Sequence, residues 1–109
     1  MRELQAIRQK AADAVNCQSV TLPSGLTVLC RTMPGYSSVH AMYATNFGSV
    51  VRAFTLNGRR ISLPAGTAHF LEHKMFESEQ GDAFDLYART GASANAFTGY
   101  DRTCYIFTS

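Results

Sequence analysis

His69-Phe70-Leu71-Glu72-His73 is the stretch of this 109-residue sequence that says most about its fold and its chemistry. The surrounding residues predict a helix from about residue 68 to residue 77, and positions three and four apart on a helix share a face. His69, Glu72 and His73 therefore project together. Two imidazoles at this spacing can both reach one Zn²⁺ ion, at about 2.0–2.1 Å.

Glu72 stands beside the two histidines without needing to be a ligand. Zinc polarises a carbonyl and lowers the pKa of bound water toward about 7, so a neighbouring carboxylate can take the proton of that water and pass it to a leaving nitrogen. We therefore predict His69 and His73 as ligands of a Zn²⁺ cofactor, and Glu72 as the catalytic residue. The alternative is a solvent-facing helix with unrelated polar residues, and it explains the inverted zincin spacing less well.

The rest of the chain predicts strands in hairpins, with few helices. Apolar residues at helical spacing predict a first helix over residues 2–14, and Asp82 is a candidate N-cap for a last one. Thr67 is a candidate N-cap for the helix with the histidines, and Ala68, Leu71 and Met75 are expected to dock that helix on a sheet. Alternating residues and turn signals predict strands at 20–22, 26–30, 38–45, 50–56, 59–63, 93–98 and 103–108. The fold class is therefore α+β, with a mostly antiparallel sheet and helices on one face.

Composition sets outer limits on the function. A length of 109 residues is sufficient for one domain with one core, and no apolar run is long enough to cross a membrane. The net charge of +2 gives no electrostatic case for nucleic acid. Three widely spaced cysteines argue against a disulfide framework. We expect a soluble, cytoplasmic protein with no nucleic-acid or membrane partner.

With these residues in view, the sequence resembles the inverzincin (M16) metallopeptidases, the group of pitrilysin, insulin-degrading enzyme and the mitochondrial processing peptidases. The resemblance is carried by residues 20–29, by Gly66 to His73 with Phe76, and by residues 91–98. Residues 74–82 are most similar to a bacterial branch. The resemblance implies a LuxS/MPP-like metallohydrolase fold, present here in part. It covers residues 19–109 as the N-terminal part of a peptidase domain and leaves residues 1–18 as a helical extension.

The resemblance also implies how substrate binds. Asn95, Ala96, Phe97 and Thr98 match the family's edge strand, on which a peptide lies extended, with the Asn95 amide offered to its backbone. From the residues alone, Asn95 is equally well a turn or bulge residue. The expected partners are a peptide substrate and a second homologous M16-type domain or subunit.

A catalytic zinc site needs three protein ligands, and this sequence supplies two clear ones. The family's third ligand is a glutamate on a later helix, so we expect it beyond Ser109. Glu77 would be a strained third ligand, and Asp101 lies in an expected loop. Two alternatives to a zinc endopeptidase stay open. The first is a non-catalytic fragment that binds peptide or a partner, and the second is an enzyme like the autoinducer synthase that cleaves S-ribosylhomocysteine, with Cys104 as the third ligand.

Overall fold

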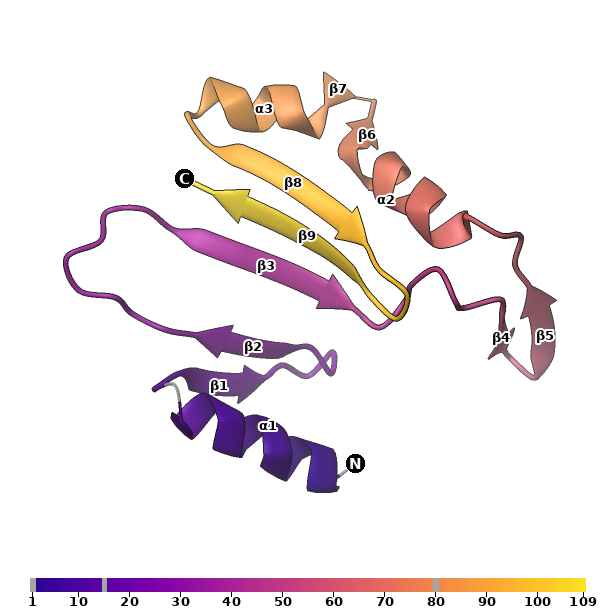
Figure 1. Cartoon of the computed structure of the whole chain (residues 1–109), viewed down its shortest axis with the longest axis horizontal. Helices are drawn as coiled ribbons and strands as arrows, with labels where there is room; N and C mark the ends of the chain where they lie inside the picture. Colours follow the sequence, from indigo (N-terminus) through magenta and orange to yellow (C-terminus); the bar gives the residue numbers. More distant parts are fainter. Residues whose placement is uncertain (1, 15, 80) are drawn as a thin grey trace. The chain divides into compact units, whose positions relative to one another are not determined.

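The computed structural model describes residues 2–14, 16–79 and 81–109 (Figure 1). The chain divides into two compact units, Met1–Tyr36 and Ser37–Ser109. The described elements are α1 (Arg2–Ala14), β1 (Gln18–Thr21), β2 (Thr27–Cys30), β3 (His40–Thr45), β4 (Ala53–Leu56), β5 (Arg59–Ser62), α2 (Thr67–Phe76), β6 (Glu77–Ser78), β7 (Gly81–Asp82), α3 (Ala83–Arg89), β8 (Ser93–Thr98) and β9 (Thr103–Thr108).

The first unit holds α1 and the β1–β2 hairpin. Helix α1 has the predicted bounds and contacts β1, and the hairpin pairs Gln18 with Cys30 through Thr21 with Thr27. Its turn contains Gly25 in the left-handed region, which only glycine adopts freely. The division of the chain after residue 18 stays a prediction, and residues 1 and 15 of the proposed extension lie outside the described residues.

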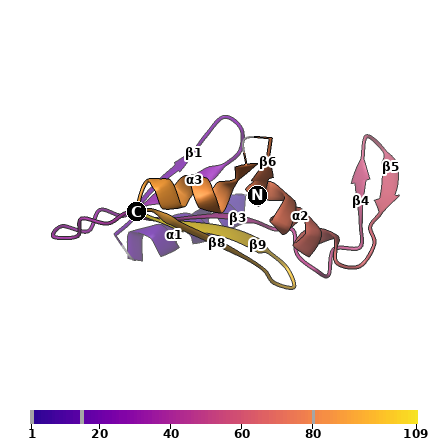
Figure 2. The ribbon, with the colours of Figure 1, turned by 90° about the horizontal axis from the view of Figure 1, so that it is seen from above.

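The second unit is organised around a three-stranded antiparallel sheet with the order β3-β9-β8. Strands β8 and β9 have the predicted bounds. Alternation along β9 places Thr103, Tyr105 and Phe107 on one face of the sheet. Rings from both helices contact this face, Phe76 of α2 against Tyr105 and Tyr87 of α3 against Phe107. Figures 1 and 2 show α2 and α3 following one another along β8. The predicted class, α+β with antiparallel strands and helices on one face, is confirmed.

The side of α2 that docks on the sheet differs from the predicted one. Ala68 is 4% exposed, but Met75 is 69% exposed and Leu71 is also exposed. The docked stripe is instead Ala68, Glu72 and Phe76, which lie four residues apart on the helix. The prediction with Leu71 and Met75 was wrong because it placed Glu72 on the side of the helix away from the sheet, whereas its carboxylate has a partner in β8.

The core of the described residues is small. Its buried members are Gly48, Ala68, Thr103 and Cys104. Beside the helices, the sheet leaves an apolar hollow of about 300 Å³, lined by Ala41, Met42, Tyr43, Phe76, Tyr87, Ala94, Tyr105, Ile106 and Phe107. The expectation of one full hydrophobic core is therefore not met within the described part of the chain, because the two helices cover only part of one sheet face.

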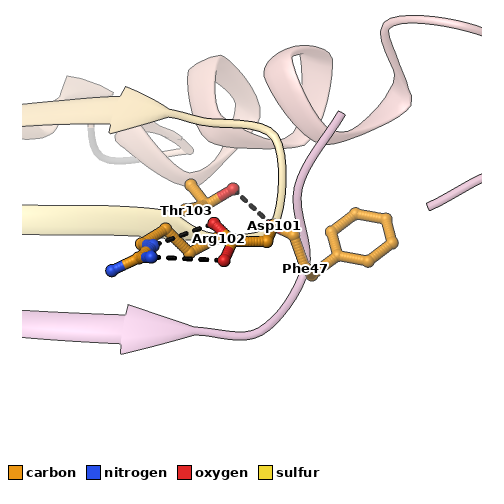
Figure 3. A network of polar contacts seen from close by, with 4 residues as sticks. All are labelled: Phe47, Asp101, Arg102 and Thr103. Atoms are coloured by element: carbon orange, nitrogen blue, oxygen red, sulfur yellow. Dashed lines mark hydrogen bonds and ion pairs between the residues drawn. The ribbon is translucent and has the colours of Figure 1, made fainter. Parts of the chain in front are cut away.

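The turn between β8 and β9 is tied to the segment that follows β3. The amides of Ser49 and Val50 donate to the carbonyls of Gly99 and Tyr100, at 2.9 and 3.0 Å. The Thr103 hydroxyl donates to the Phe47 carbonyl at 2.7 Å, and an exposed ion pair joins Asp101 and Arg102 (Figure 3). These contacts fix the end of β8, where Thr98 lies.

Two local predictions are confirmed away from the sheet. Asn57 and Gly58, at φ 51° and 74°, form the tight turn between β4 and β5, which is the left-handed conformation a two-residue hairpin needs. Asp82 caps α3 by accepting a hydrogen bond from the Phe84 amide at 2.8 Å. No helix in the described part of the chain is long and apolar enough to cross a membrane.

Candidate metal centre

Helix α2 positions the histidines, and its start is built by backbone geometry. Gly66 precedes the helix at φ 84°, and its carbonyl accepts from the Phe70 amide. Thr67 is the first helical residue, and its hydroxyl donates to the Pro64 carbonyl at 2.8 Å. The prediction of Thr67 as the N-cap was wrong by one position, since a glycine can adopt the left-handed conformation that this entry into the helix requires.

The rings of His69 and His73 lie on successive turns of α2, with their Nε2 atoms side by side. They are stacked, with centroids 4.8 Å apart and planes 10° from parallel. Their Nε2 atoms are 2.8 Å apart, within hydrogen-bond distance, and both side chains are exposed. Two nitrogens are therefore presented together to the solvent beside α2.

This pair fits one tetrahedral metal ion after a small adjustment. Two nitrogens bound to zinc at about 2.0–2.1 Å with tetrahedral angles are about 3.3 Å apart, so they need to separate by only about half an ångström. Exposed side chains can make that change by small rotations about their side-chain bonds. His69 and His73 can thus hold a metal ion together, as two of its ligands.

Glu72 lies between the histidines and the sheet. Its carboxylate Oε2 accepts a hydrogen bond from the hydroxyl of Thr98, in β8, and both side chains are partly buried. The charge of this carboxylate also affects the pKa of Tyr105, in β9. Burial raises the pKa of Tyr105 above its ordinary value, and the charge of Glu72 and the nearby Tyr43 raise it further. The catalytic candidate is therefore held at the sheet surface, three residues after His69 and directly before His73 on the helix.

The other acidic candidates near the site have partners of their own. Glu77 pairs with Lys74 at 2.5 Å, and this hydrogen-bonded pairing lowers the pKa of Glu77. Asp101 is held in the same way by Arg102, which lowers the pKa of Asp101. Within the described ranges, no group of three His, Cys, Asp or Glu side chains could hold a metal ion. Among the described residues, the two histidines thus form an incomplete ligand set.

Cys104, the ligand that an autoinducer-synthase-like site would require, lies on the wrong face of the sheet. It is 3% exposed and alternates with Thr103 and Tyr105, whose side chains face the helices. Its side chain therefore points away from α2, and no change of side-chain conformation alone could bring it to His69 and His73.

Strand β8 forms one edge of its sheet, beside α2. The Gly99 amide donates to the Arg102 carbonyl at 2.8 Å, which makes this pair a hydrogen-bonded one. Because such pairs alternate in antiparallel sheets, the backbone groups of Ala94, Ala96 and Thr98 point to the free edge. The edge therefore offers a row of outward donors and acceptors next to Glu72.

One of these outward backbone groups, the Ala96 amide, is already hydrogen-bonded to the side chain of Asn95. Its side-chain Oδ1 accepts from the Ala96 amide at 2.8 Å. Asn95 thus lies within a regular strand and not in a turn or bulge. The substrate-binding role of Asn95, Ala96, Phe97 and Thr98 stays a prediction, as do the ligand roles of His69 and His73 and the catalytic role of Glu72.

The chain was compared with known proteins at the level of family, sequence and structure. The model of the insulinase family, peptidase family M16, matches residues 62–109. A solved structure of an M16-like peptidase from Alicyclobacillus acidocaldarius superposes with a TM-score of 0.80 and 43% identity, covering 85% of this chain and 22% of that one. The chain belongs to peptidase family M16.

Curated relatives of this M16 chain are bacterial. An uncharacterized zinc protease of Bacillus subtilis, YmfH, is 41% identical over 81% of the chain and 21% of its own length. An uncharacterized zinc protease of Mycobacterium leprae, ML0855, is 33% identical over 89% of the chain and 21% of its own length. The chain thus spans about a fifth of the length of the relatives it matches.

Two relationships of Glu72 were not predicted from the sequence: its hydrogen bond with Thr98 and the effect of its charge on the pKa of Tyr105. Alternation along β8 and β9 does place both residues on one face, and this signal was present in the sequence. The contact to α2 depends on how the helix is turned against the sheet, which sequence spacing does not determine.

Proposed function

We propose that this M16 chain carries the zinc-binding helix, the general base and the substrate-binding edge of a zinc-dependent endopeptidase that cuts extended or unfolded peptides. One observation carries the proposal. The paired His69 and His73 nitrogens, the Glu72 carboxylate and the free edge of β8 are gathered in one place, although Thr98 follows Glu72 by 26 residues.

When bound, zinc supplies a Lewis acid that polarises the peptide carbonyl and makes water more acidic. His69 and His73 would hold it through Nε2. Glu72 then acts as general base: its carboxylate takes the proton of the attacking water and delivers it to the leaving nitrogen. Its hydrogen bond to Thr98 leaves the other oxygen, Oε1, without a partner among the described residues, and this oxygen is available for the proton.

The edge of β8 gives the substrate its orientation. An extended peptide can add to the strand through the outward backbone groups of Ala94, Ala96 and Thr98, with little demand on its sequence. The Asn95 side chain must then release the Ala96 amide, after which its amide group can bond the peptide. A peptide aligned in this way passes alongside Glu72, since Thr98 contacts both.

We further propose that the working site includes polypeptide outside these 109 residues. It would supply a third ligand, and a second homologous M16-type domain or subunit would close over the substrate. The proposal is supported by the two-histidine ligand set and by the fifth of the relatives' length that the chain spans. We propose that the protein is bacterial, as its curated relatives are, and cytoplasmic. The cytoplasmic location is supported by its three cysteines, which are odd in number and widely spaced in sequence.

The test is cleavage of an unstructured fluorogenic peptide by the natural polypeptide that carries this sequence. Activity should require zinc and be abolished by a chelator. Glu72→Gln should lower kcat by at least a hundredfold while zinc stays bound, because general-base catalysis contributes about 10²–10⁴-fold. Glu77→Gln is the matched control, with the same change one turn beyond His73, and should stay within twofold of wild type.

The outcomes separate the open alternatives. Peptide binding without zinc and without cleavage would favour a non-catalytic binding protein of the same fold. Equal losses in Glu72→Gln and Glu77→Gln would contradict the role of Glu72 as base.

A further inference from the structure

The hydrogen bond between Thr98 and Glu72 joins the catalytic helix to the edge strand. Thr98 Oγ1 donates and Glu72 Oε2 accepts, across 26 residues of sequence. Glu72 is the only acidic residue of α2, so this is the only carboxylate that the helix can offer to the sheet. Both partners are partly buried, and the bond is therefore shielded from competition by water.

A general base works only when one oxygen is free and correctly aimed. A glutamate side chain has three rotatable bonds, and holding it in one conformation costs entropy unless a contact fixes it. The Thr98 hydroxyl supplies such a contact to Oε2, while Oε1 has no hydrogen-bond partner among the described residues. One oxygen is thus anchored, and the other is left for chemistry.

We propose that Thr98 is a positioning residue for Glu72: its hydroxyl fixes the carboxylate beside the two histidines and keeps it next to the edge of β8. This inference rests on the proposed peptidase function and assigns the Thr98 side chain a part in it. The backbone of Thr98 still serves the edge, because its amide and carbonyl point outward. The side chain of Thr98 therefore orients the general base, whereas its backbone binds the substrate.

The test replaces the hydroxyl while keeping the backbone. Thr98→Val is nearly isosteric and lacks the donor, and Thr98→Ser keeps the donor. In the natural polypeptide, Thr98→Val should lower kcat by about tenfold to a hundredfold, the usual range for residues that orient a metal site from outside its ligand shell. KM should stay within twofold, because the edge is unchanged. Thr98→Ser should restore kcat to within about threefold of wild type.

Two further measurements separate positioning from general damage. Bound zinc and the thermal midpoint should be close to wild type in both variants. A crystal structure of each variant should show Glu72 displaced from β8 in Thr98→Val and in place in Thr98→Ser. Unchanged kcat in Thr98→Val, a rise in KM alone, or a serine variant as impaired as the valine variant would overturn the proposal.

These readouts also distinguish this inference from the proposed function. If the wild-type protein neither binds zinc nor cleaves peptide, the peptidase proposal fails, and the crystal structures then decide the role of Thr98. Glu72 resting in the same place against β8 in Thr98→Val would overturn that role even then.

Discussion

Gly48 lies directly against the backbone of Tyr100, in the turn that joins β8 to β9. A β-carbon at position 48 would be 2.4 Å from the Tyr100 carbonyl oxygen and 2.5 Å from the Arg102 amide nitrogen. Real contacts are never this short, and backbone atoms on both sides leave little room to move. The close approach lets Ser49 and Val50 bond this turn and so fixes the end of β8 that carries Thr98.

Gly48→Ala is therefore expected to destabilise the second unit. Overpacking of this kind costs about 1–3 kcal/mol in the free energy of unfolding, which urea titration followed by circular dichroism would measure. Gly99→Ala is the matched control, because its β-carbon would be 3.6 Å from the nearest atom, an ordinary contact. Equal stabilities for the two variants would show that the packing of Gly48 against the turn is not needed.

The pKa of Tyr105 reports where the Glu72 carboxylate lies. Burial raises this pKa most, and the charge of Glu72 adds to the increase. In metal-free protein, Glu72→Gln should lower the pKa of Tyr105 while leaving it above the ordinary value, and Glu77→Gln should not change it. A pH titration followed by NMR of ¹³C-labelled tyrosine measures this. No change in Glu72→Gln would place the carboxylate away from Tyr105.

The same shift predicts the sign of a change in stability at alkaline pH. The folded-state pKa of Tyr105 is raised above its ordinary value of 10.0, so the neutral phenol favours folding. Its contribution is fully present below about pH 10 and is lost as the pH rises through the folded-state pKa. Tyr105→Phe should remove this part of the alkaline loss, as seen in the free energy of unfolding measured at several pH values.

Proline substitution tests the free edge of β8. Ala96→Pro removes an amide that points outward, so the ladder to β9 stays intact, and proline is tolerated at such edge positions. KM for an extended peptide should rise by about tenfold, since one hydrogen bond to a substrate strand is lost. Phe97→Pro removes an amide of the ladder itself and should unfold the sheet, because proline cannot donate that hydrogen bond. An unchanged KM in a folded Ala96→Pro protein would contradict substrate binding along this edge.

Local structure was predictable from the sequence where short-range chemistry decides it. Asn57-Gly58 can hardly form anything but a tight hairpin turn, and the bounds of β8 and β9 follow from alternation on either side of residues 99–102. The spacing of His69 and His73 likewise places both rings on one face of a helix, and the structure stacks them. These features depend on neighbours within four residues or on one tight turn.

The docking of α2 depended on distant residues and was predicted wrongly. Leu71 and Met75 are more apolar than Glu72, so hydrophobicity alone turns the helix the other way. The helix instead packs through Ala68 and Phe76. The Glu72 carboxylate between them is tolerated at the sheet because the Thr98 hydroxyl donates a hydrogen bond to it. A buried polar group is tolerated only with such a partner, and the partner lies 26 residues away in sequence.

The most direct test of the central claim is the zinc content of the purified natural polypeptide that carries this sequence. Elemental analysis should find one zinc per chain in wild type, in Glu72→Gln, and in His40→Ala, a control at an exposed histidine of β3 that bonds Thr108. His69→Ala and His73→Ala should each lose most of the metal, because each removes one of the ligands. A full complement of zinc in either of these two variants, or no zinc in wild type, would contradict the metal centre on α2.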